Sequence, residues 1–162
     1  MFPGGTSLRF FIWSIVMLSV ILYPMSEAGH DRMRVFKNKP FTRFAQKNDI
    51  SDSDLCKTIL DADHGLIGAD LGGGVIKQRM ARKGSGMSGG FRTLIFFRAR
   101  ERAIFVHGFA KNDVENIRPD ELTALKKLAA EMLAYRREEL ESAIASGTLM
   151  EVKCDGKSEA VS

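Results

Sequence analysis

Three strand-like runs in the middle of the chain constrain its fold more than any other feature. Apolar and β-branched residues dominate Val75–Ala81, Phe91–Arg98 and Ala103–Phe109. A glycine-rich loop separates the first two runs, and a polar turn at Arg100–Arg102 separates the last two. Runs joined this closely pair as antiparallel hairpins, so the pattern predicts a three-stranded meander. The last two runs are apolar on both faces, which is typical of central strands covered by helices.

Signals for one strand and two helices precede the meander. Arg34–Phe36 is a short strand candidate. Pro40 suits the first turn of a short helix, and Ser51–Asp54 offers capping chemistry for a second one. The second helix is expected to end near His64–Gly65, with Gly65 at the position after the helix C-terminus, where glycine is typical. Leu66–Leu71 is interpreted as a connecting segment.

Helical signals also follow the meander. Pro119 lies at an early position of a helix whose apolar stripe runs through Leu122–Leu133. A last short helix is expected around Leu140–Ile144, ended by Gly147, and Lys153–Ser162 is predicted to be a disordered tail. The order of strand, two helices, meander and helix predicts an α+β fold, with helices packed on a mainly antiparallel sheet.

Charge is distributed unevenly along a mildly basic chain. The length of 162 residues is typical of a single domain, and the formal net charge is +4. Between Lys77 and Arg102 lie eight Lys or Arg residues and one acid, Glu101, whereas the segment after Val114 is rich in glutamate. A local cationic field attracts polyanions, nucleic acid first among them. A solvated surface with no partner is the alternative interpretation.

The two cysteines, Cys56 and Cys154, lie far apart in the sequence. They form no Cys-x-x-Cys motif and have no nearby pair of histidines, so no metal site is expected. One disulfide is possible, but Cys154 lies in a polar tail. Both are therefore predicted to be free thiols in a reducing compartment.

The first 32 residues form a hydrophobic leader that has two interpretations. Phe10–Tyr23 carries no charge, and Ser26–Ala28 is a passable cleavage site, as in a secretory signal peptide. Alternatively, Met33 begins a self-sufficient domain, and the leader is translated sequence upstream of the real start. The first interpretation implies export or membrane targeting, and the second a cytoplasmic protein.

The strand–loop–strand segment carries the chemistry. Lys77 and Arg79 are two residues apart, so on a strand they project from the same face. Arg92 lies in the same acid-free stretch, beside a glycine-rich loop. A strand face of cations beside a glycine-rich loop is suited to binding phosphate groups. The run Gly72–Gly74 has no following GK[ST] and is not a P-loop, and Gly84–Gly90 is interpretable as a plain hairpin loop.

Two segments together resemble a known family. They read GGGVIKQRMARKGSGMSGGFRT from Gly72 and GFAKNDVENIRPDELTALKKLA from Gly108. In this order they are similar to the RelE/ParE superfamily of bacterial toxins, specifically the HigB-like RelE group of type II toxin–antitoxin modules. The resemblance covers Met33 to Val152. It implies a small RelE-like domain at 33–152, between a leader at 1–32 and a tail at 153–162.

The resemblance implies an activity. Members of the RelE type are ribosome-dependent mRNA endonucleases that inhibit translation by cutting the codon in the A site. Cutting RNA without metal or cofactor needs the 2′-hydroxyl to attack the adjacent phosphate. That reaction requires a base at the 2′-oxygen, cations around the pentacoordinate phosphorus and a proton for the leaving 5′-oxygen.

The family pattern assigns four catalytic candidates. Lys77 is the candidate base, because crowding by other cations favours the neutral amine. Arg79 would hold phosphate oxygens, and Arg92 follows a Gly-aromatic pair and suits bidentate phosphate contact. Lys111, at the end of the third run, would neutralise charge or donate the proton.

Other residues are assigned to binding or left aside. Arg82 and Lys83 are expected to bind the rRNA backbone, and Phe91 to stack on an mRNA base. Many RelE members carry a catalytic tyrosine near the C-terminus. Tyr135 does not match that position, which leaves the identity of the acid or base open. A histidine suits acid–base work, but His107 lies in a buried-looking strand and is interpreted as structural.

A second class of function stays open beside the nuclease. ParE-type relatives share the fold and poison DNA gyrase without cutting RNA, and an inactive binding remnant is a third possibility. The expected partners are a helix-turn-helix antitoxin, the ribosome with its mRNA and, through the antitoxin complex, promoter DNA; no membrane is expected. A toxin that acts on ribosomes has no use for export, so initiation at Met33 and a cytoplasmic location are predicted.

Overall fold

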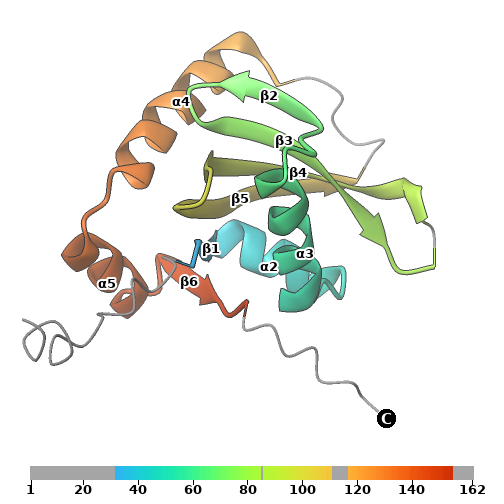
Figure 1. Cartoon of the computed structure of the whole chain (residues 1–162), viewed down its shortest axis with the longest axis horizontal. Coiled ribbons are helices and arrows are strands. Elements are labelled where there is room, and N and C mark those ends of the chain that lie inside the picture. The colour runs from blue at the N-terminus through green and yellow to red at the C-terminus, as the bar shows by residue number, and fades with distance from the viewer. Residues whose placement is uncertain (1–31, 85, 111–116, 155–162) are drawn as a thin grey trace, which may run out of the picture. The chain divides into compact units, whose positions relative to one another are not determined.

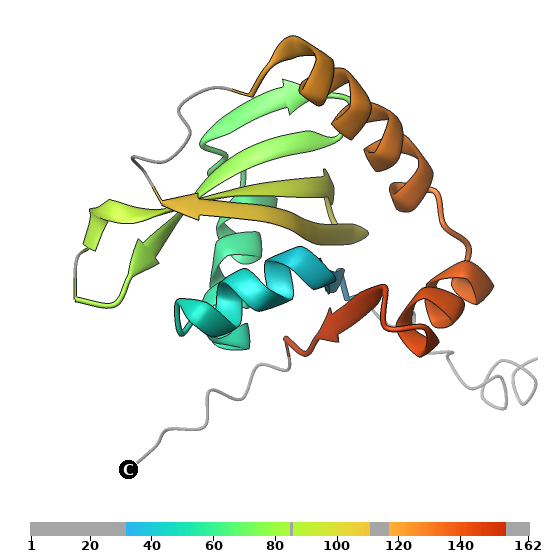
Figure 2. The same cartoon turned by 180° about the vertical axis from the view of Figure 1, so that it is seen from behind.

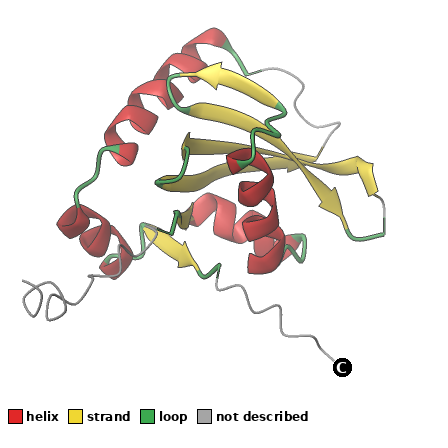
Figure 3. Cartoon of the chain, in the orientation of Figure 1, coloured by secondary structure: helices red, strands yellow, loops and turns green. Residues whose placement is uncertain are grey.

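The computed structural model describes residues 32–84, 86–110 and 117–154, with the backbone alone at 86–88 (Figure 1). Residues 1–31 of the leader and the final eight residues lie outside this part of the chain. The described elements, coloured by type in Figure 3, follow in order: β1 (Arg34–Asn38), α2 (Lys39–Lys47), α3 (Asp52–Asp63), β2 (Ala69–Gly72), β3 (Val75–Arg82), β4 (Gly86–Arg98), β5 (Arg102–Ala110), α4 (Pro119–Leu133), α5 (Arg137–Ala145) and β6 (Leu149–Val152).

The strands form one six-stranded sheet in the order β2-β3-β4-β5-β1-β6. The β3–β4–β5 meander lies at its centre, as the sequence predicted. β1 pairs in parallel with β5, with Val35 opposite Ala103, and every other pairing is antiparallel. The mixed, mainly antiparallel sheet confirms the predicted α+β class.

Helices cover both faces of this sheet (Figures 1 and 2). On one face α2 and α3 pack through residues such as Phe41 and Leu55 against strand residues such as Ile95 and Phe105. On the opposite face Ala129, near the end of α4, packs in a second cluster with strand and α5 residues. Both faces are therefore buried at Thr93–Phe96 of β4 and Ala103–Val106 of β5, which explains the continuous apolar runs there.

The predicted capping signals define the helix ends. The Asn38 side chain accepts a hydrogen bond from the Phe41 N–H at 2.9 Å, one residue after Pro40 enters the first turn of α2. Ser51 and Asp54 form a reciprocal capping box at the start of α3. After α3, Gly65 adopts φ +86°, the left-handed conformation expected of the residue that follows a helix.

Two short strands were not predicted. The interpretation of Leu66–Leu71 as a connection was wrong in part, because Ala69–Gly72 forms β2 and pairs with β3. Leu149–Val152 forms β6, which pairs with β1 at the other edge of the sheet. Each strand has only four residues, and neither alternates between buried and exposed positions. Their pairing partners, rather than their own composition, define them as strands.

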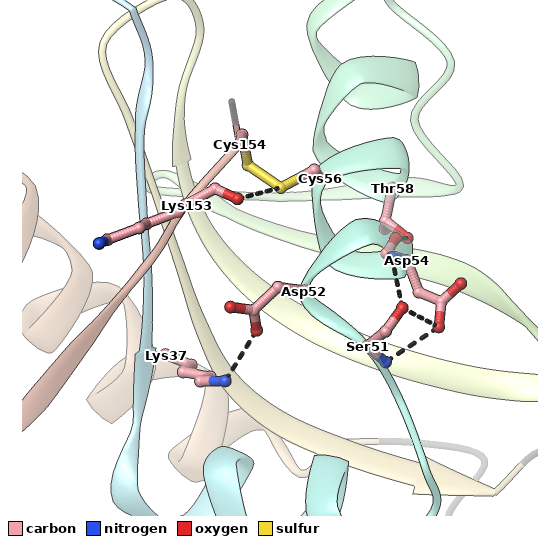
Figure 4. The surroundings of a disulfide bond; sticks show 8 residues. All are labelled: Lys37, Ser51, Asp52, Asp54, Cys56, Thr58, Lys153 and Cys154. Carbon is pink, nitrogen blue, oxygen red and sulfur yellow. Dashed lines mark hydrogen bonds and ion pairs between the residues drawn. A yellow bond between two sulfur atoms is a disulfide. The ribbon is translucent and has the colours of Figure 1, made fainter. Parts of the chain in front are cut away.

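The prediction of two free thiols was wrong, because Cys56 and Cys154 form a disulfide (Figure 4). Cys56 lies on α3 and Cys154 follows β6 by two residues, and β6 runs past the start of α3 because it pairs with β1. Nearby, an ion pair joins β1 to the start of α3, where Lys37 Nζ lies 3.0 Å from the Asp52 carboxylate. Sheet pairing therefore brings together two cysteines that are 98 positions apart in the sequence.

Candidate active site

Strand register places three cations on one face of the sheet. Lys77 is directly opposite Leu94, which packs in the cluster beneath α4, so both side chains lie on the α4 side. Arg79 is directly opposite Arg92. Arg79 lies two residues after Lys77, and Arg92 lies two residues before Leu94, so these two side chains also lie on the α4 side. We call Lys77, Arg79 and Arg92 the cationic face. The structure thus brings together the three strand residues that the sequence had grouped.

The cationic face lies on the same side of the sheet as α4. This helix covers one end of that side. At Gly74, beside the first residue of β3, an added Cβ would contact Leu133 and Ala129 of α4. Lys77 and Arg79 lie two and four residues beyond Val75, or about 7 and 13 Å along the strand. Arg79 is exposed, whereas Lys77 and Arg92 are half-buried. The cations therefore occupy the part of this surface that leads away from α4.

No carboxylate among the described residues forms an ion pair with any of these three cations. Within the described part of the chain, the one hydrogen bond from a side chain of the set is a long one of 3.5 Å, from Arg92 Nη1 to the Phe91 carbonyl. Like charges directly opposite on neighbouring strands destabilise a sheet, and Arg79 faces Arg92 in this way. An anion bound between the two guanidinium groups would remove that repulsion and accept bidentate hydrogen bonds.

A buried glutamine on the opposite side of β3 holds the strand in position through two hydrogen bonds. Gln78 is 4% exposed, and its amide accepts from the Gly68 N–H at 2.8 Å and donates to the Leu66 carbonyl at 2.6 Å. An added Cβ at Gly68 would lie 2.8 Å from the Lys77 carbonyl oxygen, so the approach requires glycine. These contacts fix the backbone that carries Lys77 and Arg79.

The assignment of Phe91 to base stacking is corrected by its position. Its side chain is 3% exposed and packs on the α2 side, edge-to-face with Phe44 at a centroid distance of 5.3 Å. Met80, opposite Phe91 on β3, packs in the same cluster. Phe91 precedes Arg92, and successive strand residues point to opposite faces. Phe91 is therefore a core residue with no free ring face for a nucleobase.

Arg82 and Lys83 lie apart from the cationic face. The Arg82 guanidinium is 5.6 Å from the centroid of the Phe91 ring, on the α2 side of the sheet. Lys83 Nζ lies 3.0 Å from the Asp49 carboxylate, in a pair of exposed side chains. The two cations thus belong to a separate surface near the end of α2. Their assignment to the rRNA backbone remains a prediction.

Lys111 and His107 are the remaining two residues that the sequence suggested for the site. Lys111 lies outside the described residues. The interpretation of His107 as a buried residue was wrong, because its side chain is exposed. Its ring lies 5.8 Å from that of Phe109, which packs in the cluster beneath α4. His107 therefore projects from the α4 side of the sheet, the same side as the cationic face.

Within the part of the chain that the structure describes, no cluster of three His, Cys, Asp or Glu side chains is arranged to hold a metal ion. None of the helices described is long and apolar enough to span a membrane. The chemistry available at the cationic face is binding of phosphate and stabilisation of developing negative charge by fixed cations.

Comparison with known protein families identifies the family of the chain. The model of the family described as RelE toxin of RelE / RelB toxin-antitoxin system matches residues 33–152. A search of curated proteins finds no match. The matched region contains every described helix and strand, together with the cationic face. The chain therefore belongs to the RelE toxin family, whose members are toxins of type II toxin–antitoxin modules.

Proposed function

We propose that this chain is a ribosome-dependent mRNA endonuclease that inhibits translation by cutting the codon in the A site. The observation that carries the proposal is the cationic face, with two arginines directly opposite each other and a lysine two residues away along β3. None of the three cations is neutralised by a described carboxylate. A chain that must bind a scissile phosphate needs such a surface.

The proposed reaction needs no metal ion or cofactor. The 2′-oxygen attacks the adjacent phosphorus, the bond from phosphorus to the 5′-oxygen breaks, and the products carry a 2′,3′-cyclic phosphate and a 5′-hydroxyl. Lys77 accepts the 2′-proton, and Arg79 and Arg92 hold the non-bridging oxygens as negative charge develops. Lys111 adds positive charge. Arg82 and Lys83 bind the rRNA backbone from the neighbouring surface.

Family membership implies an antitoxin partner. We propose that this antitoxin carries a helix-turn-helix and an acidic segment that covers the cationic face, since charge complementarity favours that pairing. The complex would repress its own promoter, so contact with promoter DNA would occur only through the antitoxin. We also propose that translation starts at Met33 and that the toxin is cytoplasmic, within the HigB-like group.

The competing function is a ParE-like toxin that binds and poisons DNA gyrase. Gyrase binding does not require a set of uncompensated phosphate-facing cations, so the cationic face favours the nuclease. The test adds the chain from Met33 onward to a cell-free translation reaction. We expect protein synthesis to stop and cleaved mRNA to be recovered from ribosomes. Intact mRNA together with gyrase-dependent DNA breaks would refute the nuclease and support the alternative.

A further inference from the structure

A β-bulge in β5 determines where His107 points. Leu94 is opposite His107, but the next residue, Ile95, is opposite Phe105, so Val106 has no counterpart on β4. The residues on either side show the effect. Phe105 packs on the α2 side, and Val106 and Phe109 both pack beneath α4. Strict alternation would put residues 106 and 109 on opposite faces.

The bulge reverses the alternation between Val106 and Gly108. An added Cβ at Gly108 would lie 2.3 Å from the Phe44 ring, so position 108 faces the α2 side. His107 therefore lies on the α4 side, next to Val106 rather than opposite it. Without the extra residue, His107 would point into the aromatic cluster beneath α2.

A side chain from another element supports the bulge. Asn38 Nδ2 donates a hydrogen bond of 3.0 Å to the carbonyl of Val106, the residue with no partner on β4. The Oδ1 atom of the same amide accepts from Phe41 at the start of α2. The side chain that caps α2 thus also binds the backbone immediately before His107.

Register then relates His107 to the cationic face. Lys77 and His107 are both directly opposite Leu94, one from each neighbouring strand. Two strand spacings separate their backbones by about 10 Å. Arg92 is the diagonal neighbour of both, with Cα separations of about 7–8 Å. A phosphate held by Arg92 would therefore have an amine on one side and an imidazole on the other.

We propose that His107 is the proton donor to the leaving 5′-oxygen in RNA cleavage, an inference that rests on the proposed function. In-line displacement places the attacking 2′-oxygen and the leaving 5′-oxygen on opposite sides of the phosphorus. The 2′-oxygen forms its bond to phosphorus as its proton passes to Lys77. The bond to the 5′-oxygen breaks as a ring N–H of His107 passes a proton to that oxygen. Imidazole is the side chain best suited to such a transfer near neutral pH.

The test compares two leaving groups. Ribosomes are programmed with an mRNA whose scissile linkage has either the normal 5′-oxygen or a bridging 5′-sulfur. A thiolate leaves without protonation, so the sulfur substrate does not need an acid. Single-turnover cleavage is measured for the full chain and for His107→Gln and His107→Asn, with His64→Gln as the matched control at an exposed histidine after α3. Thermal unfolding of each protein confirms that it is folded.

We expect both His107 variants to cleave the oxygen substrate at least about 100-fold more slowly than the unsubstituted chain. On the sulfur substrate they should stay within about threefold of it, and His64→Gln should match it on both. Equal slowing on both substrates would overturn the role of His107 as the acid, and so would an unchanged rate on the oxygen substrate. If the unsubstituted chain cuts neither substrate, the proposed function itself is refuted.

Discussion

Removal of the Cys56–Cys154 disulfide should destabilise the domain strongly. The resulting loss in the free energy of unfolding is the first quantity we would measure. The bond closes a loop with a sequence separation of 98 residues. Loss of chain entropy in the unfolded state predicts a stabilisation of about 4.7 kcal/mol for a loop of that length, and measured disulfides more often contribute about 2–4 kcal/mol. We therefore expect Cys56→Ser, Cys154→Ser and the double variant each to lose about 2–4 kcal/mol.

Urea unfolding followed by circular dichroism measures this loss. With an m value of about 1.5 kcal/mol per molar, the midpoint of each variant should fall by roughly 1–3 M below that of the oxidised chain. In the presence of a reductant the unsubstituted chain should unfold close to the variants, because all of them then lack the cross-link. In a reducing compartment the domain would have this lower stability.

The reasoning would be refuted by coincident unfolding of the oxidised chain and the double variant in non-reducing buffer. A thiol titration under denaturing, non-reducing conditions provides the control, and it should detect neither cysteine. Detection of both thiols would show that the sulfurs are not bonded, and the predicted cost would then have no basis.

Three further predictions concern the scaffold, and one concerns the chemistry. Gly108→Ala should cost about 1–3 kcal/mol in urea unfolding, because the added Cβ would lie 2.3 Å from the Phe44 ring; an unchanged midpoint would contradict this packing. Gln78→Ala should cost about 1–3 kcal/mol by the same assay, since it removes two hydrogen bonds, from the Gly68 N–H and to the Leu66 carbonyl, each worth about 0.5–1.5 kcal/mol; a cost below about 0.5 kcal/mol would contradict it. The Arg34 guanidinium lowers the pKa of Glu151, so this carboxylate stabilises the fold above its ordinary titration range and loses that effect as pH falls through its lowered pKa. Because both side chains are about one-third exposed, at 33% and 38%, Glu151→Gln should cost less than about 1 kcal/mol at pH 7, and the cost should shrink as the pH falls through the lowered pKa of Glu151; a cost that does not change with pH would exclude the ion pair as its source. A 2′-deoxy substitution at the scissile nucleotide should abolish mRNA cleavage on programmed ribosomes, and cleavage at the normal rate would exclude attack by the 2′-hydroxyl.

Local sequence patterns predicted the elements whose signals lie within a few residues. The capping box at Ser51–Asp54 and the glycine after α3 define their helix by short-range hydrogen bonds and backbone conformation. The three meander strands carry enough apolar residues to be recognised without their partners. The grouping of Lys77 with Arg79 followed from the two-residue period of a strand, and the antiparallel register shows that Arg92 lies on the same face.

The features that were missed depend on contacts between distant parts of the chain. Leu149–Val152 is a strand because β1 lies beside it, and the disulfide follows from that pairing. His107 was interpreted as buried because regular alternation was assumed along β5. The bulge at Val106 is a property of the pairing between β4 and β5, which neither strand reveals alone. Phe91 was assigned to stacking from its place in the chain, but the pairing of β4 with β3 puts it opposite Met80 in the cluster on the α2 side.

The most direct test of the central claim is the rate at which the chain cuts the A-site codon on programmed ribosomes. The comparison is between the unsubstituted chain, Arg92→Ala and Arg137→Ala, the last at an exposed arginine of α5. We predict that Arg92→Ala lowers the single-turnover rate at least about 100-fold, as expected when a fixed cation is removed from a developing charge, and that Arg137→Ala stays within about threefold. Cleavage by Arg92→Ala at the unsubstituted rate, or mRNA left intact by all three proteins, would contradict the account.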